Sequence, residues 1–554
     1  MKKSAAFWTI SKIRHRIPMI AVLTGSHIIH ALFSVLFALG TRGVIDSAVA
    51  GNSADFISAC VRQLCIILVI LSFLALQRHL RDKLHADLER DWKRTLLRGL
   101  LHGEYSAIQK YHSAELINRL NNDVTKVNDG ILGILPGAAS MITRLTASVV
   151  VLGILDLRFT VIIAVIGALL IAITGVVRTK LKNLNKRVSE HDGKVSGFIQ
   201  ETLEKLLMVQ AMDVADEVER RSDTLLDDRY KIQRKRKNIT LVVNTGISLS
   251  FYGIGFIALA WGAYRMLHGD LSFGSLTAMT QLVSQIQNPF VSLSGLLPLY
   301  TSMSASAERL MELDSIQGEP PAESEDPQVL YSKTSSIGAE ALRFSYDRDL
   351  LLSGASFALP KGAFAVITGP SGIGKSTLLK LLLGIYVPEG GKLFFMCGNG
   401  QRIPIERSMR RMFAYVPQGN LLLSGSIRDN LVIVRPDATD EQIHQAVYVS
   451  AMDEFLPALP NGIDTVLGES GAGLSEGQSQ RLAIARAILT GAPILLLDEC
   501  TSALDEKTEQ TVLKRLRSLP EITCIAVTHR PAATELCDWR LEMDGGKINA
   551  VKLR

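Results

Sequence analysis

Residues 369 to 376 read GPSGIGKS, which fits the phosphate-loop pattern of Gly, four residues, Gly, Lys and Ser at every fixed position. The residues before it, 363–368 (AFAVIT), form an apolar run typical of a strand, and residues 377–383 (TLLKLLL) have the character of a buried helix. The motif requires this order of strand, glycine-rich turn and helix, which argues against an ordinary glycine-rich turn. The stretch predicts an α/β domain that binds a nucleoside triphosphate.

The residue types of this loop indicate how it would hold a nucleotide. Glycines let successive backbone N–H groups turn toward phosphate oxygens, and the helix N-terminus adds positive potential. Lys375 can reach the β and γ phosphates, and the hydroxyl of Ser376 can ligate Mg²⁺. The nucleotide-binding residues expected in the loop are Gly369, Ser371, Gly372, Gly374, Lys375, Ser376 and Thr377.

Composition indicates that a membrane domain accompanies this nucleotide-binding domain. The chain has 554 residues, 47% of them hydrophobic, and its mean hydropathy is positive. The net charge of +6 is small for this length and does not require a nucleic-acid partner, because Lys and Arg also collect on cytoplasmic membrane flanks. The six cysteines show no paired metal spacing, so neither a disulfide framework nor a zinc site is expected. They are Cys60, Cys65, Cys397, Cys500, Cys524 and Cys537.

Hydropathy predicts an all-α transmembrane domain of six helices in the first part of the chain. The spans are expected near 17–40, 61–76, 131–155, 159–177, 239–267 and 273–300. The long segments 77–130 and 178–238 are basic and helical, and the positive-inside rule places them in the cytosol together with both termini. The basic cluster at 231–237 lies directly before a span, so this rule explains it better than a nucleic-acid patch does. The expected location is the cytoplasmic membrane.

Composition also predicts the domain boundaries. Residues 4–14 carry Phe7, Trp8, Ile10 and Ile13 among basic residues, which suits a short helix in the membrane interface. No cleavage signal follows, so this segment is expected to stay in the mature protein. Composition then turns rich in Glu, Asp, Pro and Ser, which predicts a linker. The predicted parts are a transmembrane domain over 1–315, a linker over 316–338 and an α/β P-loop nucleotide-binding domain over 339–554.

A second motif of the nucleotide-binding domain supplies carboxylates. Residues 494–499 (ILLLDE) are four apolar residues followed by two acids, the pattern of a buried strand that ends at a nucleotide site. Asp498 can hold Mg²⁺ through water, and Glu499 can polarise the attacking water. A strand that merely ends in acids is the alternative, but it does not explain the accompanying phosphate loop.

Residues 474–478 (LSEGQ), followed by Gln480 and Arg481, resemble the signature of ATP-binding cassette proteins. The resemblance implies ATP as the nucleotide and two cassettes packed head to tail, with Ser475, Gly477 and Gln478 of one cassette facing the ATP of the other. The partner would be a second half-transporter, either a copy of this chain or a related chain. The usual third residue of the signature is Gly, so Glu476 departs from the pattern and leaves the strength of that contact open.

The same resemblance assigns four residues outside these motifs. Tyr346, in FSYDR, is at the position of the ring that stacks on adenine. Gln418, in YVPQGN, is at the position of the Gln that contacts Mg²⁺. Asp505, in SALD, resembles the dimer-contact loop, and His529, in VTHR, resembles the switch histidine that touches the γ-phosphate. With Glu499, His529 would be catalytic, while Ser376, Gln418 and Asp498 would surround Mg²⁺.

Six spans before one cassette resemble an exporter-type half-transporter, and this resemblance covers almost the whole chain. It implies short transverse coupling helices near 106–112 and 208–214, and an ATPase that moves a small-molecule, lipid or peptide cargo by alternating access. Import of a siderophore-like cargo and ATP-gated regulation without net transport remain the alternatives. A soluble cassette protein would lack the six spans. No nucleic-acid partner is implied.

Polar residues inside the spans are the candidates for a cargo path, because such residues are costly in lipid. Gln281, Gln285 and Asn288 share one face of the sixth span, and hydrogen bonding between helices explains them about as well as a cavity does. His27 and His30 lie one turn apart in the first span. Arg144 lies well inside the third span, where no acid is available, and this predicts a wet cavity that favours negative or zwitterionic cargo.

Overall fold

The computed structural model describes residues 5–554 except 317, 319–325, 347–348, 420–421, 469–470, 520 and 529; the side chains at 6, 168–182, 290–294, 297 and 531–532 also lie outside the described set. The chain divides into two compact units. The first unit comprises Met1–Arg98 and Ser113–Ser315, and the second comprises Gly99–His112 and Ile316–Arg554. Residues Gly99–His112, which are part of the segment 77–130 expected in the cytosol, thus belong to the same unit as the nucleotide-binding domain.

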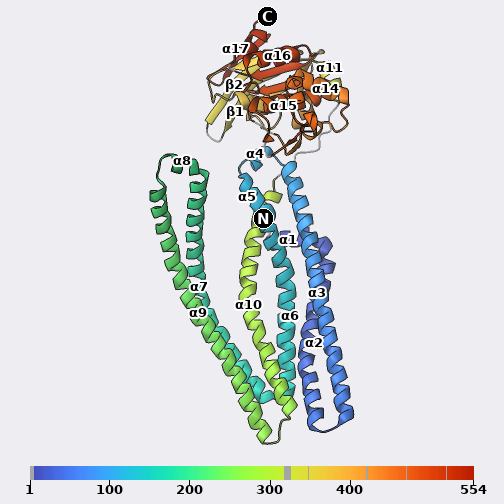
Figure 1. The fold of residues 1–554 in the computed structure, drawn as a ribbon, viewed down its shortest axis with the longest axis vertical. Coiled ribbons are helices and arrows are strands. Elements are labelled where there is room, and N and C mark those ends of the chain that lie inside the picture. Colours follow the sequence, from blue (N-terminus) through green and yellow to red (C-terminus); the bar gives the residue numbers. More distant parts are fainter. Residues whose placement is uncertain are drawn as a thin grey trace. The chain divides into compact units, whose positions relative to one another are not determined.

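Long helices make up the first unit, and their bounds match the predicted spans and cytosolic extensions (Figure 1). They are α2 (Ile17–Val49), α3 (Ser53–Leu101), α6 (Val124–Leu155), α7 (Leu157–Glu204), α9 (Ala215–Leu267) and α10 (Phe273–Asp314). Short helices α5 (Ser113–Asn118) and α8 (Leu206–Ala211) lie between them, and a π-helical turn spans Arg119–Asp123. Within the described residues, four helical stretches are long and apolar enough to cross a membrane, at 14–49, 53–101, 113–155 and 215–267. The fourth and sixth predicted spans lie on α7 and α10, where some side chains are outside the described set.

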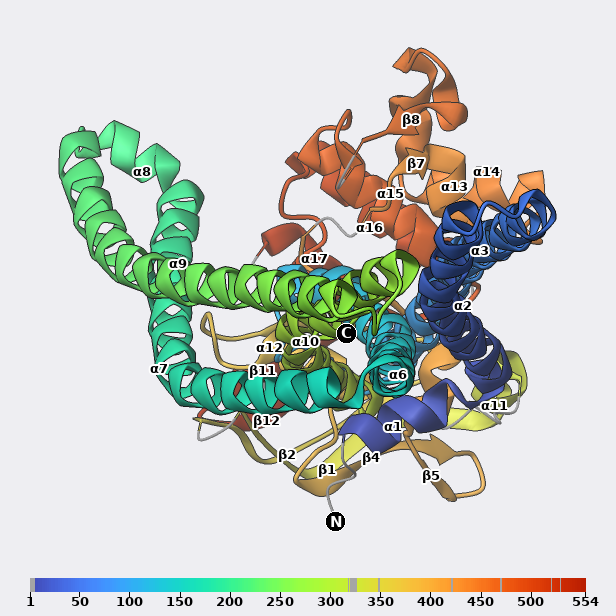
Figure 2. The ribbon, with the colours of Figure 1, turned by 90° about the horizontal axis from the view of Figure 1, so that it is seen from below.

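The first unit consists of a packed group of helices and an extended hairpin. Helices α2, α6 and α10 pack along one another. Helices α7 and α9 pair with each other and extend away from this group toward α8, as Figures 1 and 2 show. Asp156 separates α6 from α7 and caps α7 by accepting a hydrogen bond from the backbone N–H of Phe159 at 3.0 Å. A single non-helical residue therefore connects the helices that contain the third and fourth predicted spans.

The N-terminal helix differs in part from the expected interfacial helix. Helix α1 (Ala5–Lys12) forms, and Phe7 is exposed. Trp8, however, is 5% exposed: its ring lies 5.1 Å from that of Trp92, and its Nε1 donates to Asp314 at 2.9 Å. Trp8 thus packs inside the protein because an aromatic partner and a carboxylate from distant segments meet it there.

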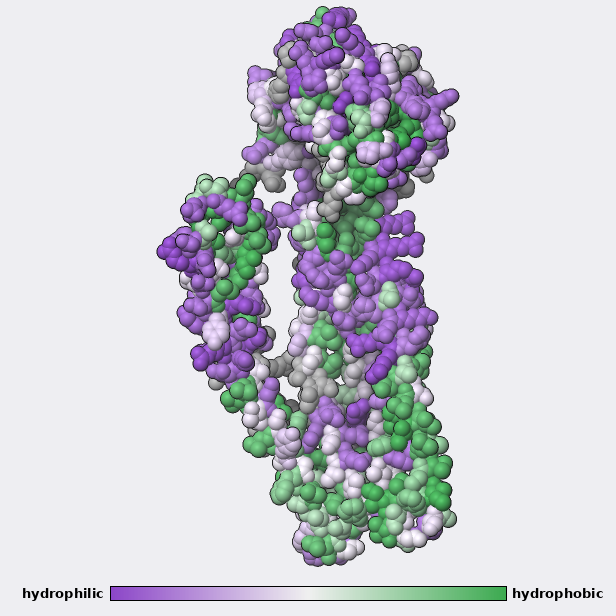
Figure 3. All heavy atoms as spheres, viewed as in Figure 1, coloured by the Kyte–Doolittle hydropathy of each residue, from purple (hydrophilic) through white to green (hydrophobic). Residues whose placement is uncertain are grey.

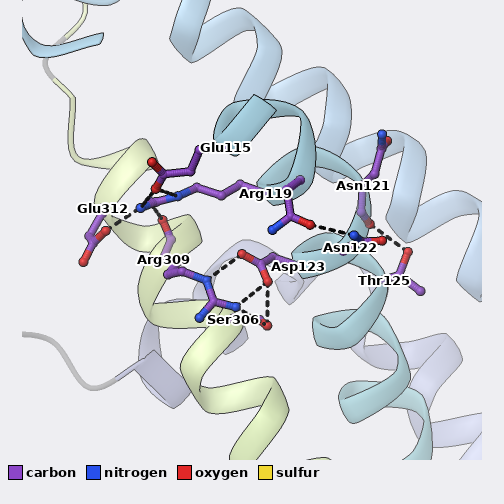
Figure 4. A network of polar contacts seen from close by, with 10 residues as sticks. Glu115, Arg119, Asn121, Asn122, Asp123, Thr125, Ser306, Arg309 and Glu312 are labelled. Atoms are coloured by element: carbon purple, nitrogen blue, oxygen red, sulfur yellow. Dashed lines mark hydrogen bonds and ion pairs between the residues drawn. The ribbon is translucent and has the colours of Figure 1, made fainter. Parts of the chain in front are cut away.

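A buried polar network joins the start of α6 to the end of α10 (Figure 4). Asp123 is fully buried, and its carboxylate accepts hydrogen bonds from Ser306 Oγ at 2.9 Å and from Arg309 Nε at 2.8 Å and Nη2 at 2.5 Å. One turn earlier, Arg119 donates to Glu115 at 2.7 Å and to Glu312 at 3.0 Å. These charges are paired and hydrogen-bonded, as buried charges must be.

The second unit contains the α/β domain, and its sheets follow the predicted pattern of short apolar strands. The six-stranded sheet has the order β12-β11-β3-β10-β9-β6, and its neighbours are parallel except for the β11–β12 pair. A second sheet has the order β2-β1-β4-β5 and is antiparallel, and β7 pairs with β8. The strands are β1 (Thr334–Tyr346), β2 (Asp349–Pro360), β3 (Phe364–Thr368), β4 (Gly390–Cys397), β5 (Arg402–Pro404), β6 (Phe413–Val416), β7 (Gly425–Ser426), β8 (Val466–Leu467), β9 (Ile494–Asp498), β10 (Thr523–Val527), β11 (Trp539–Asp544) and β12 (Lys547–Lys552).

Among the described residues of this unit, three apolar cores contribute to its stability. One fills the space between the two larger sheets and helix α12 (Lys375–Leu382), and the second packs helices α15 (Glu476–Leu489) and α16 (Glu506–Arg517) against the other face of the parallel sheet. The third holds α13 (Ile427–Val432), α14 (Asp440–Val449) and the other face of α15 together. Every strand of the parallel sheet that leads into a motif is therefore buried on both faces.

The expected linker extends less far than 316–338. Residues 327–333 form helix α11 (Pro327–Lys333), and β1 starts directly after it. Leu330 and Tyr331 of α11 are buried in the apolar core of the second unit, and the Tyr331 hydroxyl donates to the backbone carbonyl of Glu521 at 2.7 Å. The polar composition of this segment does not indicate that two of its residues are buried, because their burial depends on contacts with distant strands.

Candidate nucleotide site

The phosphate loop lies between β3 and α12, as the sequence predicts. Gly372 and Gly374 have φ angles of +80° and +103°, which residues with a side chain rarely adopt. The loop therefore needs glycine at both positions. Lys375 is 6% exposed, and its Nζ donates to the carbonyl oxygens of Gly369 and Pro370, both at 2.9 Å. The lysine is thus held directly over the loop that would carry the phosphates.

Asp498 lies at the end of β9, next to the phosphate loop. Its carboxylate accepts hydrogen bonds from Ser376 Oγ at 2.9 Å and from the Tyr415 hydroxyl at 3.1 Å. Burial is the main cause that raises the pKa of Asp498, with the neighbouring Glu499 carboxylate adding to it, while the two hydrogen bonds oppose the shift. A cation bound beside Asp498 would relieve this penalty on the carboxylate.

Glu499 follows Asp498 in a strained backbone conformation. Its φ angle is +50°, a region that costs a non-glycine residue about 1–3 kcal/mol. The backbone N–H of Glu499 donates to the carbonyl of Val527 on β10 at 3.0 Å, and its side chain accepts a hydrogen bond from Gln418 Nε2 at 2.8 Å. In this conformation the half-buried carboxylate lies within hydrogen-bonding distance of Gln418.

The donor set beside the phosphate loop suits Mg²⁺. Ser376 supplies a hydroxyl and Asp498 a carboxylate, and Mg²⁺ in nucleotide sites takes one or two such protein ligands together with phosphates and waters. Within the described residues, no group of three His, Cys, Asp or Glu side chains could hold a metal by itself. These residues therefore fit a cation that arrives with the nucleotide. Such an ion would neutralise charge on the phosphates.

Tyr346 lies at the end of β1 in a cluster of aromatic rings. Its ring centroid is 5.4 Å from that of Tyr386 with the planes nearly perpendicular, and 37% of Tyr346 is exposed, which leaves ring surface for stacking on adenine. Tyr386 also contacts Tyr105, with centroids 6.4 Å apart, and its hydroxyl donates to Gln109 Oε1 at 2.7 Å. Tyr105 belongs to helix α4 (Tyr105–Ile108), where the first coupling helix is predicted. The predicted second one falls on α8.

The signature motif forms the start of α15. The Ser475 hydroxyl accepts from the backbone N–H of Gln478 at 3.2 Å, and the Gln478 side chain accepts from the backbone N–H of Ser475 at 2.9 Å. This capping box fixes an exposed helix N-terminus, with Ser475 and Glu476 at the surface. A Cβ at Gly477 would lie only 3.0 Å from the carbonyl oxygen of Ala503, so the helix can approach the next loop closely only with glycine there.

Gln480 connects the signature helix to the loop after β9. Its side chain donates to Ser502 Oγ at 3.1 Å and accepts from the backbone N–H of Ala503 at 3.0 Å. The Asp505 carboxylate caps α16 by accepting from the backbone N–H of Thr508 at 3.0 Å. His529 lies outside the described residues, although β10, which leads to it, pairs with β9.

The structure thus brings together the phosphate loop, Asp498, Glu499 and Gln418, while Ser475 lies at the exposed end of α15. Two further residues of the site, Tyr415 and Tyr386, were not predicted from the sequence. Tyr415 is three residues before Gln418 in the motif YVPQGN, so this motif could have indicated it. No local pattern singles out Tyr386, which depends on contacts with β1 and α4.

Comparison with known proteins agrees with this geometry. Residues 19–290 match the ABC transporter transmembrane region model, and residues 352–502 match the ABC transporter model of the cassette. A β-(1→2)glucan export ATP-binding/permease protein, NdvA of Mesorhizobium japonicum, is 30% identical over 400 residues, which is 71% of this chain and 67% of NdvA. This chain belongs to the ABC transporter family.

Other ABC transporters match both larger and smaller parts of the chain. A probable ABC transporter ATP-binding/permease protein of Haemophilus influenzae is 29% identical over 452 residues, 80% of each chain. The α-hemolysin translocation protein HlyB of Escherichia coli is 31% identical over 355 residues, 64% of this chain and 50% of HlyB. A solved bacterial Atm1-family ABC exporter with ATP bound superposes with a TM-score of 0.79 at 23% identity, covering 98% of this chain and 95% of that one.

These comparisons, with the two units, confirm the predicted fold of a helical membrane domain fused to a P-loop cassette. The protein is a membrane protein of the exporter type, and its ATPase activity is coupled to transport. The cassette model implies ATP binding.

Proposed function

We propose that this half-transporter hydrolyses ATP with Mg²⁺ at the site formed by the phosphate loop, Asp498 and Glu499, and uses the cycle to move a cargo out across the cytoplasmic membrane. One observation carries the proposal: Ser376 contacts Asp498 at 2.9 Å while the strained Glu499 is hydrogen-bonded to Gln418 at 2.8 Å. This arrangement would supply a loop for the phosphates, a carboxylate that can hold a cation and a second carboxylate that can polarise water.

Each residue has a defined task in this proposal. Lys375 and the loop N–H groups would bind and orient the phosphates, and Ser376 and Asp498 would hold the cation against them. Glu499 would accept a hydrogen bond from the attacking water and polarise it, with Gln418 fixing the carboxylate. Tyr346 would stack on adenine, and His529 would contact the γ-phosphate.

Two exposed features support a dimer as the working form. Ser475 and Glu476 stand at the free N-terminus of α15, where a serine hydroxyl and backbone N–H groups can meet an anion from another chain. Helix α8, at the end of the α7–α9 hairpin, exposes 81% of Leu207, and Met212 just after it is 66% exposed. An apolar tip on an extended hairpin suits docking on a second half-transporter. Asp505 would then lie near the shared interface.

Alternating access would link this ATPase to cargo movement. ATP binding would close the cassettes, α4 and α8 would pass the change to the spans, and hydrolysis would reset the dimer. Both termini and both coupling helices would lie in the cytosol, because the long basic segments flank the spans on that side. Export is favoured by two relatives, the glucan export protein NdvA and the α-hemolysin translocation protein HlyB. Import and ATP-gated regulation are the alternative outcomes of the tests below.

The primary test is Glu499→Gln. The amide keeps the shape of the side chain but does not polarise water, so ATP binding should persist while steady-state ATPase falls below about a tenth of wild type. Lys375→Ala should instead weaken ATP binding itself. Hydrolysis by Glu499→Gln at the wild-type rate would contradict the assignment.

Two further measurements test whether two chains share the site and in which direction the cargo moves. Ser475→Arg should abolish hydrolysis in the pure mutant if two copies of this chain share the site, and mixing with wild-type chains should restore part of it. Unchanged activity of the pure mutant would remove the shared-site proposal. The sign of ATP-driven cargo accumulation in proteoliposomes distinguishes export, import and the absence of net transport.

A further inference from the structure

Arg144 carries a charge where the membrane domain offers no acid. It lies in α6, twelve residues before Asp156 at the external end, which is about 18 Å along a helix. That distance puts Arg144 near the middle of a hydrocarbon core about 30 Å thick. The apolar segments contain no Asp or Glu: they are 17–41, 63–77, 130–155, 159–177, 239–267 and 273–300. An intramembrane guanidinium without an acid needs water, a polar surface or an anionic ligand.

The polar atoms around Arg144 retain unused hydrogen-bonding capacity. Among the described residues, Arg144 Nε has no hydrogen-bond partner although it is inaccessible to solvent. Ser148, one turn further along α6, is fully buried, and its hydroxyl also lacks a partner in this set. His30 of α2 interacts electrostatically with Arg144, so an imidazole ring lies close to the guanidinium. A membrane helix rarely keeps such groups without a function.

The helix registers place Arg144 beside the polar face of α10. A Cβ at Gly133 would meet Leu299 at 2.9 Å, and one at Gly137 would meet Leu296 at 3.4 Å, so α6 and α10 run antiparallel in matching steps. When this register is extended toward the external ends of the two helices, Arg144 lies at the same level as residues 288–289 of α10.

The contact of α2 with α10 gives the same level independently. Gln285 Nε2 donates to the carbonyl of Ser34 at 2.6 Å, and the backbone N–H of Gly274 donates to Asp46 at 3.0 Å. This antiparallel register puts His30 level with residues 289–290 of α10, within one residue of the level of Arg144. Arg144, His30 and the polar face of α10 therefore meet at one depth.

Gln281 and Gln285 of α10 extend this polar surface toward the external end of the helix. The hydrogen bond from Gln285 to Ser34 shows that packing between helices explains part of the stripe. The Oε1 atoms of Gln281 and Gln285 are nevertheless buried and have no partner among the described residues. Figure 3 shows hydrophilic side chains gathered over α6 and α10 within the otherwise apolar part of the first unit.

A second basic group lies on the cytosolic side of this surface. His27 of α2 interacts electrostatically with both His30 and Arg81 of α3. Arg81, His27, His30 and Arg144 thus form a series of basic or protonatable side chains that runs from the cytosolic extension of α3 toward the middle of the membrane. An anion entering from the cytosol would meet the positive charges of Arg81 and Arg144, with the two imidazoles between them as hydrogen-bonding groups.

We propose that Arg144 binds an anionic group of the cargo, a carboxylate or a phosphate, while His30 and the α10 amides hydrogen-bond its polar neighbours. A planar guanidinium can hold either anion with two parallel hydrogen bonds. The inference rests on the proposed transport function and adds the chemical class of the cargo to it. The anion could be the headgroup of a lipid or part of a water-soluble molecule, and the test separates these sources.

The test measures binding to the full-length protein in phosphatidylcholine nanodiscs without nucleotide. Two matched pairs of probes differ only in the phosphate: naphthyl phosphate against naphthol in water, and dioctanoyl phosphatidate against dioctanoylglycerol in the bilayer. Wild type should prefer the phosphate member of at least one pair by about tenfold or more. The pair that shows the preference identifies a soluble or a lipid anion.

Variants assign the preference to Arg144. Arg144→Gln should reduce it below about twofold, Arg144→Lys should retain part of it, and Arg62→Gln, at the external end of α3, should leave it unchanged. A thermal unfolding midpoint and an elution profile equal to those of wild type show that the membrane unit of each variant is folded. Absence of any preference in wild type, or its persistence in Arg144→Gln, would overturn the proposal.

A labelling experiment gives an answer even if Arg144→Gln does not fold. In a background with Cys60 and Cys65 replaced by Ala, Arg144→Cys should react with a membrane-impermeant thiol reagent, and the preferred probe should slow the reaction. An unreactive position 144, or equal rates with and without the probe, would overturn the proposal. Neither measurement uses ATP hydrolysis, so a failed Glu499→Gln test and a failed Arg144 test remain distinguishable.

Discussion

Arg309→Met should destabilise the membrane unit through the carboxylate that it leaves behind. Asp123 is fully buried, and two of its three side-chain hydrogen bonds come from Arg309. Removing one partner of a buried ion pair costs about 3–5 kcal/mol. Because the Arg309 side chain is 40% exposed, water can partly replace it, and about 2–3 kcal/mol is the better expectation.

Thermal unfolding in detergent can measure this loss. For a unit of this size, 2–3 kcal/mol corresponds to a decrease of about 4–6 °C in the unfolding midpoint. The double variant Asp123→Leu with Arg309→Met should recover most of the decrease, because no buried charge then remains unpaired. Lys205→Met is the matched control: it removes an exposed ion pair with Glu201 at 2.8 Å, which should leave the midpoint within about one degree of wild type.

The result that would refute this reasoning is a midpoint for Arg309→Met no lower than that of Lys205→Met. In that case Asp123 would be solvated in the folded protein, and the network in Figure 4 would contribute little to stability. A double variant as unstable as the single one would instead show that packing of the Arg309 stem, not charge pairing, is the main contribution.

Two predictions concern the nucleotide site. Tyr346→Ala should weaken ATP binding by about tenfold through loss of stacking, whereas Tyr346→Phe should bind nearly as well, which a fluorescent ATP analogue can measure. The raised pKa of Asp498 means that its stabilising contribution is full below the unfolded pKa and is lost as pH rises through the folded one. Mg²⁺ with nucleotide should therefore stabilise the cassette more at high pH, where the Asp498 carboxylate is charged, than at low pH. Thermal-shift measurements can test this, and Asp498→Asn should abolish the difference between the two pH values. An unchanged difference in this variant would exclude Asp498 as the residue that holds the cation.

The nucleotide motifs and the spans could be predicted from the sequence because both depend on local patterns. The glycine spacing of 369–376 is tied to backbone conformation within eight residues, and the apolar run 494–497 defines a buried strand without its neighbours. Spans depend on the length and hydropathy of continuous segments, so their predicted positions agree with the long helices.

The tertiary structure alone decided the contacts between distant segments. Tyr415 reaches Asp498 across 83 residues, and Trp8 meets Asp314 across 306 residues. The polar linker composition gave no sign that Tyr331 is a core residue. The strained φ of Glu499 likewise has no local signature, because a non-glycine residue keeps such a conformation only when surrounding contacts hold it.

Arg144 shows most clearly which properties follow from the sequence and which follow from the tertiary structure. Its charge, its depth in the third span and the lack of an acid are properties of the sequence. Its neighbours are not, because a helix register is set by side chains that interlock between α2, α6 and α10. Local patterns thus determined which residues could bind nucleotide or lie in the membrane, and packing between remote helices and strands decided which of them meet.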